Sequence, residues 1–387
     1  MKTTSAIVDN LPASATIALT DKARTLKAQG HKIVSFSAGE PDFDTPAHIK
    51  EAANRSMQSG FTHYVSSRGI PKLLDAIAAK LSSENGVKVD PATDIIVTPG
   101  SKVALYITLA TLLNPGDEVL ILEPGWVSYD ALVRLQGAIP VPVALDWRNG
   151  WLIDEAQLQE VITPRTKALI VNSPNNPTGR VLSDMELQAI ARVATQHDLY
   201  VISDEVYDRI IYDVRPTSPG SLPGLAERTL TVNGFSKTFA MTGWRLGYVA
   251  GNRGIISRIL NVQQHVVTCA TSFVQEAGVT ALNGPQEPVE EMIRAYRARR
   301  DVIVSALQQM PGVHCNMPEG AFYAFPRFDT FPSSDALAAT LLDNCQIATI
   351  PGLAFGKTGE QHLRFSYACS MDDIEAGMEK LDKFLRG

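Results

Sequence analysis

The segment ALIVNSPNNPTGRVLSDMELQAIARVATQHDLYVISDE (168–205) contains two short apolar runs with a helix-like stretch between them. The runs ALIVN (168–172) and LYVIS (199–203) are typical of strands buried on both faces of a sheet. Between them, Ser183 is followed three residues later by Glu186, the capping-box pattern that predicts the start of a helix. A strand, a helix and a strand in this order predict parallel strands of one sheet.

Four more apolar runs repeat this pattern through the middle of the chain, each ending in a small or polar cluster. They are DIIVTPG (94–100), EVLILEPG (118–125), TLTVNGF (229–235) and RLGYVAG (245–251). Helical stretches separate most of these runs. We therefore predict an α/β fold whose large domain holds a mostly parallel sheet with helices on both faces.

The two ends of the chain read differently from its middle. Residues 1–45 are short pieces broken by proline and glycine, whereas 286–387 contain a basic helix, a strand-like AFYAFP (321–326) and a final helix. Ser370 is a suitable N-cap for that last helix, because apolar residues then recur along one of its faces. We predict that 1–45 and 286–387 together form a smaller α+β domain and that 46–285 form the large domain.

Composition and charge exclude several classes of protein. The chain has 387 residues, 45% of them hydrophobic, and a net charge of −6 without a basic block, which argues against nucleic-acid binding. No apolar run approaches the roughly 18 residues of a membrane span, and the N-terminus lacks the apolar core of a signal peptide. The four cysteines show no paired spacing, so we expect no disulfides and a cytoplasmic protein. We also expect no metal site and no membrane partner.

Polar and aromatic residues with possible chemistry come directly after five of the predicted strands. Open α/β sheets bind ligands outside the carboxyl ends of their strands. Residues that follow different strands can therefore meet although they are far apart in the chain. We expect one crevice lined by Ser101, Trp126, Asn176, Asp204 and Lys237.

Lys237 lies among small and apolar residues in NGFSKTFAM (233–241). A lysine held among apolar neighbours loses hydration, and its pKa falls. A neutral amine can attack an aldehyde and can later remove a proton from carbon. The alternative is a solvated surface lysine, which is the usual state of this residue type.

Asp204 ends the run LYVIS and is followed three residues later by Tyr207. An acid at this place can be a helix N-cap. It can also face a protonated ring nitrogen, which a cofactor that acts as an electron sink requires. In that case Tyr207 could reach a phenolic oxygen on the same ring.

Gly100, Ser101 and Lys102 open a predicted helix directly after a strand. Free N–H groups and the helix dipole make such a turn an anion site, although a plain turn is the alternative. Arg245 would add a bidentate phosphate contact. The segment GLAFGKT (352–358) is one residue short of the spacing of a nucleotide-binding P-loop, and we reject that interpretation.

The loop NSPNNPTG (172–179) contains two X–Pro bonds, Ser173–Pro174 and Asn176–Pro177, and both are candidates for cis peptides. The amide of Asn176 can hold a cofactor's phenolic oxygen, or the segment can be an ordinary loop. Trp126 can stack on a cofactor ring or belong to the core.

Arg364 lies in HLRFSYA (362–368), an alternating strand pattern near the C-terminal end. A substrate α-carboxylate needs a planar, permanently charged partner, and arginine supplies two parallel hydrogen bonds. An exposed arginine on a surface strand is the alternative.

Together these motifs resemble the class I aminotransferases of fold type I, which depend on pyridoxal 5′-phosphate (PLP). The resemblance covers nearly the whole chain and looks most like the bacterial branch with aspartate and aspartate/prephenate aminotransferases. The segments that carry it are SAGEPDFDTP (37–46), YVSSRGIPKL (64–73), NNPTG (175–179), SDEVY (203–207), SKTFAMTGWRLGY (236–248) and LRFSYA (363–368).

The resemblance implies a seven-stranded-type sheet, a homodimer with active sites at the subunit interface, and a role for each matching residue. Lys237 would bond to the cofactor and act as the catalytic base. The cofactor would also contact Gly100, Ser101, Lys102, Trp126, Asn176, Asp204, Tyr207, Ser236 and Arg245, with Tyr64 from the neighbouring subunit. The substrate would contact Gly39, Trp126, Asn176 and Arg364, with Lys102, Ser14 and Thr16 holding a distal carboxylate.

The implied activity is transfer of an amino group from an L-amino acid, aspartate or glutamate, to a 2-keto acid by a ping-pong mechanism. Gly125 replaces the tyrosine usual in that branch, Ser101 interrupts its usual GGK turn, and HVVTCATSF (265–273) departs from its polar stretch. An aromatic or kynurenine aminotransferase and a β C–S lyase therefore stay open. A non-catalytic PLP-fold sensor would need a DNA-binding segment that this chain does not show. The roles of His63 and His265 also stay open.

Overall fold

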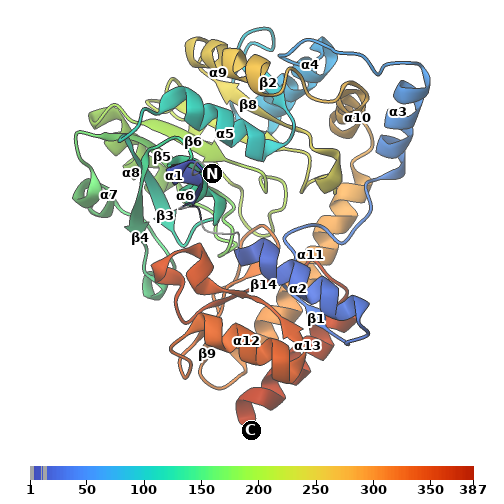
Figure 1. The fold of residues 1–387 in the computed structure, drawn as a ribbon, viewed down its shortest axis with the longest axis vertical. Coiled ribbons are helices and arrows are strands. Elements are labelled where there is room, and N and C mark those ends of the chain that lie inside the picture. Colours follow the sequence, from blue (N-terminus) through green and yellow to red (C-terminus); the bar gives the residue numbers. More distant parts are fainter. Residues whose placement is uncertain (1–3, 10, 12–14) are drawn as a thin grey trace.

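The structure is a computed structural model that describes residues 4–9, 11 and 15–387. Its centre is a seven-stranded sheet in the order β2-β8-β7-β6-β5-β3-β4 (Figure 1). The strands are β2 (Ile95–Thr98), β3 (Glu118–Glu123), β4 (Ile139–Ala144), β5 (Thr166–Asn172), β6 (Tyr200–Asp204), β7 (Thr229–Gly234) and β8 (Gly247–Gly251). Strand β8 is antiparallel to both of its neighbours, and the other pairs of this sheet are parallel. The predicted mostly parallel α/β sheet is confirmed.

Within this seven-stranded sheet, the strand that the sequence pattern did not predict is β4, at the edge of the sheet. It contains Pro140 and Pro142, which cannot donate to a ladder and therefore favour an edge strand or no strand. It pairs with β3 on one side, and only one of its six side chains is buried. Such a strand lacks the continuous apolar run that marks its buried neighbours.

Helices cover both faces of the sheet, because alternate side chains of each strand point to opposite sides. On β3, Val119 and Ile121 pack on one side, and Leu120 and Leu122 pack on the other. The first side is covered by α5 (Ser101–Leu112), α6 (Ser128–Arg134) and α9 (Arg253–Val266). The second is covered by α4 (Pro71–Lys80), α7 (Glu155–Val161), α8 (Asp184–Gln196) and α10 (Ser272–Asn283), next to α3 (Ala47–Gln58).

Two predicted helix starts are confirmed. Ser183 and Glu186 form a complete capping box at the start of α8, with each side chain bonded to the other's backbone N–H. Ser370 caps α13 (Met371–Arg386) by accepting a hydrogen bond from the backbone N–H of Asp373. Both caps satisfy N–H groups that a helix start leaves without an intrahelical partner.

The two ends of the chain pack together in the lower part of Figure 1. Strand β1 (Val34–Ser35) pairs in parallel with β12 (Ile347–Ala348), so an N-terminal segment joins the C-terminal elements. The predicted strand at 321–326 is shorter than expected, because only β10 (Tyr323–Ala324) forms there. The other elements of this part are α2 (Ala15–Ala28), α11 (Glu287–Gln308), α12 (Ser334–Cys345), β9 (Val313–His314), β11 (Arg327–Phe328), β13 (Ile350–Pro351) and β14 (Leu363–Ser366). The short helix α1 (Ala6–Asp9) is drawn apart from them, in the upper part of Figure 1. The domain limits at residues 45 and 286 stay a prediction.

The proline predictions were half right. Ser173–Pro174 is cis, as predicted, whereas Asn176–Pro177 is trans, and Glu123–Pro124 is a further cis bond. Residues 175–179 close a turn in which the N–H of Gly179 donates to the carbonyl of Asn175. A compact turn of this kind accommodates a proline in its ordinary trans form. Within residues 4–9, 11 and 15–387, no helix combines the length and apolar character that crossing a membrane requires.

Candidate active site

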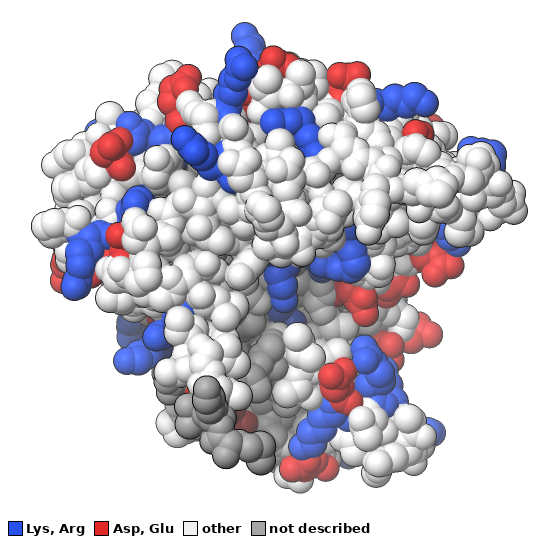
Figure 2. Space-filling view, turned by 45° about the horizontal axis from the view of Figure 1, so that its top comes forward, with Lys and Arg blue, Asp and Glu red and all other residues white. Residues whose placement is uncertain are grey.

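A cavity of about 380 Å³ lies where the carboxyl ends of the strands face α2 and β14. Figure 2 shows the molecule hollowed between its upper and lower parts, with basic side chains visible inside the hollow. Predicted site residues that line the cavity are Thr16, Gly39, Ser101, Lys102, Trp126, Asn176, Asp204, Tyr207, Ser236, Lys237, Arg245 and Arg364. Residues from five strand ends and from both ends of the chain are thereby brought together.

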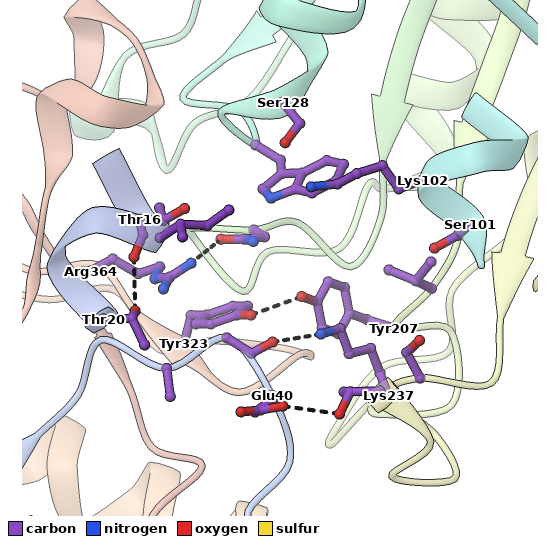
Figure 3. Close-up of a pocket in the computed structure, with 18 of the residues that line it drawn as sticks. Thr16, Thr20, Glu40, Ser101, Lys102, Ser128, Tyr207, Lys237, Tyr323 and Arg364 are labelled. Atoms are coloured by element: carbon purple, nitrogen blue, oxygen red, sulfur yellow. Dashed lines mark hydrogen bonds between the residues drawn. The ribbon is translucent and has the colours of Figure 1, made fainter. Parts of the chain in front are cut away.

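Lys237 follows β7 by three residues, and its Nζ donates a 2.5 Å hydrogen bond to the carbonyl of Gly39 (Figure 3). Burial lowers the pKa of Lys237 to about 8, although the carboxylate of Glu40 acts in the opposite direction. The positive charges of Arg364 and Arg245 lower it further. A substantial fraction of this amine is therefore neutral near pH 7 to 8, as a nucleophile and base requires.

Asp204 is the last residue of β6 and is 3% exposed. The hydroxyl of Tyr129 donates a 2.7 Å hydrogen bond to its Oδ2. Burial raises the pKa of Asp204 to about 6, and the hydrogen bond from Tyr129 limits that rise. Because a turn and not a helix follows β6, the helix N-cap interpretation of Asp204 is wrong. Sequence analysis missed Tyr129, although it lies three residues after Trp126.

An anion site lies at the start of α5. Gly100 has a φ of +89°, and a Cβ placed there would lie 2.5 Å from Nη2 of Arg245. This close approach puts the guanidinium beside the first turn of the helix, whose N–H groups have no intrahelical partner. Burial lowers the pKa of Lys102, and the charge of Arg245 adds to that effect. Two cations and a helix N-terminus therefore converge on one edge of the cavity.

Arg364 occupies the opposite side of the cavity and is 2% exposed. Its Nη1 donates to Oδ1 of Asn176 at 3.1 Å, and its Nη2 donates to the carbonyl of Ser37 at 2.8 Å. Its guanidinium lies 4.5 Å from the ring centre of Tyr323. The exposed-strand interpretation of Arg364 is therefore wrong, and the side chain is held with its plane fixed.

Tyr323 is a second residue that sequence analysis missed. Its hydroxyl lies 2.8 Å from that of Tyr207, and both side chains are buried. In Figure 3, Tyr323 lies between Arg364 and Tyr207, so it connects the two sides of the cavity. The sequence signal was weak, because an aromatic in the apolar segment 321–326 is more typical of the core.

Trp126 lines the cavity and meets Tyr129 edge to face, with ring centres 5.3 Å apart. Nζ of Lys102 lies 4.8 Å from the indole centre. A flat aromatic surface therefore borders the space between the anion site and Arg364. Helix α2 closes the outer edge with Thr16, Ile17, Thr20, Asp21 and Arg24, and all of these except Thr16 were missed from the sequence.

Four of the predicted or open residues do not line the cavity of their own chain: Gly100, which directly precedes the lining residue Ser101, and Tyr64, His63 and His265. Tyr64 is 85% exposed. Ser14 lies outside the residues that the structure describes. Across the described parts of the chain, no group of three His, Cys, Asp or Glu side chains lies close enough together to hold a metal ion.

A family model for aminotransferase class I and II matches residues 31–381. The chain belongs to this family. An aspartate aminotransferase of Musicola paradisiaca is 45% identical, with 97% of this chain and 94% of that protein covered. Aromatic-amino-acid aminotransferase 2 of Thermococcus litoralis is 43% identical, with 93% of each covered. The solved structure of aspartate aminotransferase from Thermus thermophilus with maleate has a TM-score of 0.95 and 41% identity, with both chains fully covered.

The residues of the cavity fit PLP, the cofactor of this family. The cofactor carries an aldehyde, a ring nitrogen and a phosphate, and the cavity offers a buried amine, a buried carboxylate and a cationic helix N-terminus. Nε of Arg364 is buried and has no hydrogen-bond partner among the described residues. Arg364 lines the cavity, so a cavity-lining guanidinium keeps one donor without a partner among these residues.

Proposed function

We propose that this chain is a PLP-dependent aminotransferase that moves an amino group from an L-amino acid to a 2-keto acid. The observation that carries the proposal is the meeting of Lys237 and Asp204 in one cavity, each with a pKa shifted toward neutrality by burial. Titratable groups perturbed in this way are typical of catalytic sites. When bound, PLP supplies an electron sink that withdraws electron density from the substrate's Cα.

Each of the polar residues that line the cavity then has a task that follows from its position. Asp204 would hold the proton on the ring nitrogen, and Tyr207 and Asn176 would hold the phenolic oxygen. Arg245, Ser101 and Ser236 would bind the phosphate with the first turn of α5. Such fixed contacts leave the cofactor little freedom, which aligns the bond to be broken.

Lys237 moves the proton. Its neutral Nζ would remove the proton from the substrate's Cα and would later supply a proton to the carbon that had been the cofactor's aldehyde. Arg364 binds the substrate's α-carboxylate through two parallel hydrogen bonds, and the backbone at Gly39 assists. Reaction of an amino donor and then of a keto-acid acceptor at one site gives ping-pong kinetics.

We further propose L-aspartate or L-glutamate as the amino donor, with 2-oxoglutarate as acceptor. Lys102 and Thr16 line the cavity and would hold the distal carboxylate. The names of several relatives that share 40–45% identity with this chain support this class. An aromatic donor is the second candidate, because an aromatic-amino-acid aminotransferase is also a relative and because Gly125 has no side chain beside Trp126.

The same proposal includes a homodimer of two-domain subunits in the cytoplasm. Tyr64 is exposed on its own chain, and a residue that completes a neighbour's phosphate site must be exposed in this way. With domain limits at residues 45 and 286, as we propose, the cavity would lie between the two domains. The four cysteines are unpaired, as expected in a reducing compartment.

The proposal is tested by adding amino acids one at a time to purified protein loaded with PLP. The visible absorbance of the cofactor should change with the preferred donor and return when a keto acid is added. The Lys237→Ala protein should lose this response. A protein that takes up no PLP, or a Lys237→Ala protein as active as the parent, would refute the activity. A strong preference for phenylalanine over aspartate in kcat/KM would refute the dicarboxylate substrate.

A further inference from the structure

A second group of buried polar side chains lies behind the cavity, on the turn that follows β6. Asp208 is 8% exposed, and a single atom, its Oδ2, accepts three hydrogen bonds. The donors are Nδ2 of Asn233 at 2.9 Å, Nδ2 of Asn85 at 3.1 Å and the amine of Lys80. One carboxylate oxygen therefore joins the β6 turn, β7 and the end of α4.

The two strands joined by this atom carry the proposed catalytic groups. Asp208 comes one residue after Tyr207 and four after Asp204. Asn233 comes four residues before Lys237, and its Oδ1 accepts the backbone N–H of Gly234 at 2.6 Å. The amide of Asn233 therefore connects the Asp208 carboxylate directly to the backbone that leads to Lys237.

The group is charged and buried, and its carboxylates, amides and amine are hydrogen-bonded to one another or to neighbouring hydroxyls. Lys80 also donates to Oδ1 of Asn85 at 2.8 Å, and Glu205 accepts from Asn85, Ser203 and Ser218. Glu84 lies 3.9 Å from the amine of Lys80. The buried hydroxyl of Tyr248 also interacts electrostatically with Lys80 but has no hydrogen-bond partner among the described residues. Buried ion pairs add little net stability compared with apolar packing, but a fully bonded polar network holds its elements in one arrangement.

We propose that Asp208 is a positioning residue for the aminotransferase reaction, holding the turn of Asp204 and Tyr207 in fixed register with the turn of Lys237 through Asn233. This inference rests on the proposed function. Asp208 touches neither substrate nor cofactor and acts through the residues on either side of it. Displacement of reacting groups by about 1 Å can cost about a hundredfold in rate, so a link of this kind controls activity from outside the cavity.

Two variants and one control separate positioning from stability. Asn233→Ala removes the link and leaves the ion pair of Lys80 and Asp208 in place, so no buried charge is stranded. Asp208→Asn removes the charge. The control is Glu118→Gln, because Glu118 is also a buried carboxylate with several donors, from Thr163, Arg165 and Thr166, but lies at the amino end of β3.

The first measurement needs no cofactor. The pH midpoint for modification of Lys237 by an amine reagent is followed by mass spectrometry of the full-length protein. Both variants should raise this midpoint by about half a pH unit or more, because a looser turn admits water to the amine. Glu118→Gln should leave it unchanged even if its melting temperature falls.

The second measurement uses protein loaded with PLP. Loss of a well-placed donor from Tyr207 raises the proton affinity of the cofactor's phenolic oxygen, so the pH midpoint of the visible absorbance should rise in both variants. Their kcat/KM should fall about tenfold or more, and the Glu118→Gln value should stay near that of the parent. Unchanged midpoints in variants that unfold at lower temperature would overturn the proposal, since Asp208 would then serve stability alone. A parent protein that takes up no PLP would refute the proposed function. The pH midpoints for modification of Lys237 would still show whether Asp208 and Asn233 hold the two turns in position.

Discussion

The hydroxyl of Tyr129 donates a 2.7 Å hydrogen bond to Oδ2 of Asp204 in the floor of the cavity. Both side chains are buried, and their positions differ by 75 residues in the chain. A donor to a carboxylate favours its ionised form. The hydrogen bond from Tyr129 therefore limits the effect of burial, which raises the pKa of Asp204 to about 6. It would keep the carboxylate ionised for a protonated ring nitrogen.

Tyr129→Phe is expected to raise the pKa of Asp204 further and to lower kcat/KM about tenfold or more, because a hydrogen bond to a charged group is worth about 1.5–3 kcal/mol. Since only the ionised carboxylate stabilises the ring nitrogen's charge, the loss should deepen as the pH falls from about 8 to about 6. The pH profile of kcat/KM checks this. Tyr200→Phe, at the other end of β6, is the control, and equal losses in the two variants would contradict the prediction.

Lys237→Met is expected to stabilise the cofactor-free protein at pH 7. The folded protein lowers the pKa of Lys237 from 10.5 to about 8, so it binds this proton more weakly than the unfolded chain does. The resulting cost to stability, about 3 kcal/mol, is full below about pH 8 and disappears as the pH rises toward about 10.5.

Thermal unfolding at pH 7 and in alkali, near pH 10.5, measures the stability cost of burying the charged Lys237 amine. The melting temperature of Lys237→Met should exceed that of the parent at neutral pH, and the difference should shrink in alkali. Lys72→Met replaces a lysine that is 75% exposed and should show no such trend. A Lys237→Met protein no more stable than the parent at pH 7 would show that burial of this amine is not costly.

Gly100→Ala is expected to weaken PLP binding about tenfold or more, because the new methyl would displace the guanidinium of Arg245, for which we propose a bidentate contact with the phosphate. Gly116→Ala is the matched control, since Gly116 has a φ of +88° but nothing within 4 Å of its Cβ position. Both variants carry the same backbone cost of roughly 1 kcal/mol. Titration with PLP distinguishes them, and similar dissociation constants for the two would argue against the anion site.

Arg364→Lys is expected to lower kcat/KM for the preferred amino donor about a hundredfold, since lysine cannot reproduce a planar, bidentate contact with a carboxylate. The loss should come mainly through KM if the contact serves binding, and through kcat if it also aligns Cα. Arg327→Lys is the control, because Arg327 lies over Trp147, with its Cζ 4.7 Å from the ring centre, outside the cavity. Comparable losses in both variants would mean that Arg364 supports the fold and not the substrate.

Most of the central sheet was predictable because buried parallel strands must be continuous apolar runs. Six of its seven strands follow that pattern, and the seventh, β4, escapes it because an edge strand tolerates Pro140 and Pro142. The residues after the strands were also recognisable, since chemistry concentrates at the carboxyl edge of such a sheet. The trans state of the Asn176–Pro177 bond could not be predicted, because the turn that surrounds a proline decides its isomer and the X–Pro dipeptide alone does not.

The sequence by itself determined the class of fold, the family and the residues that follow each strand, because local periodicity and short motifs encode them. Only the tertiary structure decided which side chains support those residues. Tyr129 meets Asp204 across 75 positions, Tyr323 meets Tyr207 across 116, and Lys80 meets Asp208 across 128. These partners carry no local pattern, since a buried carboxylate or phenol accepts whichever donor the packed sheet and helices bring within reach.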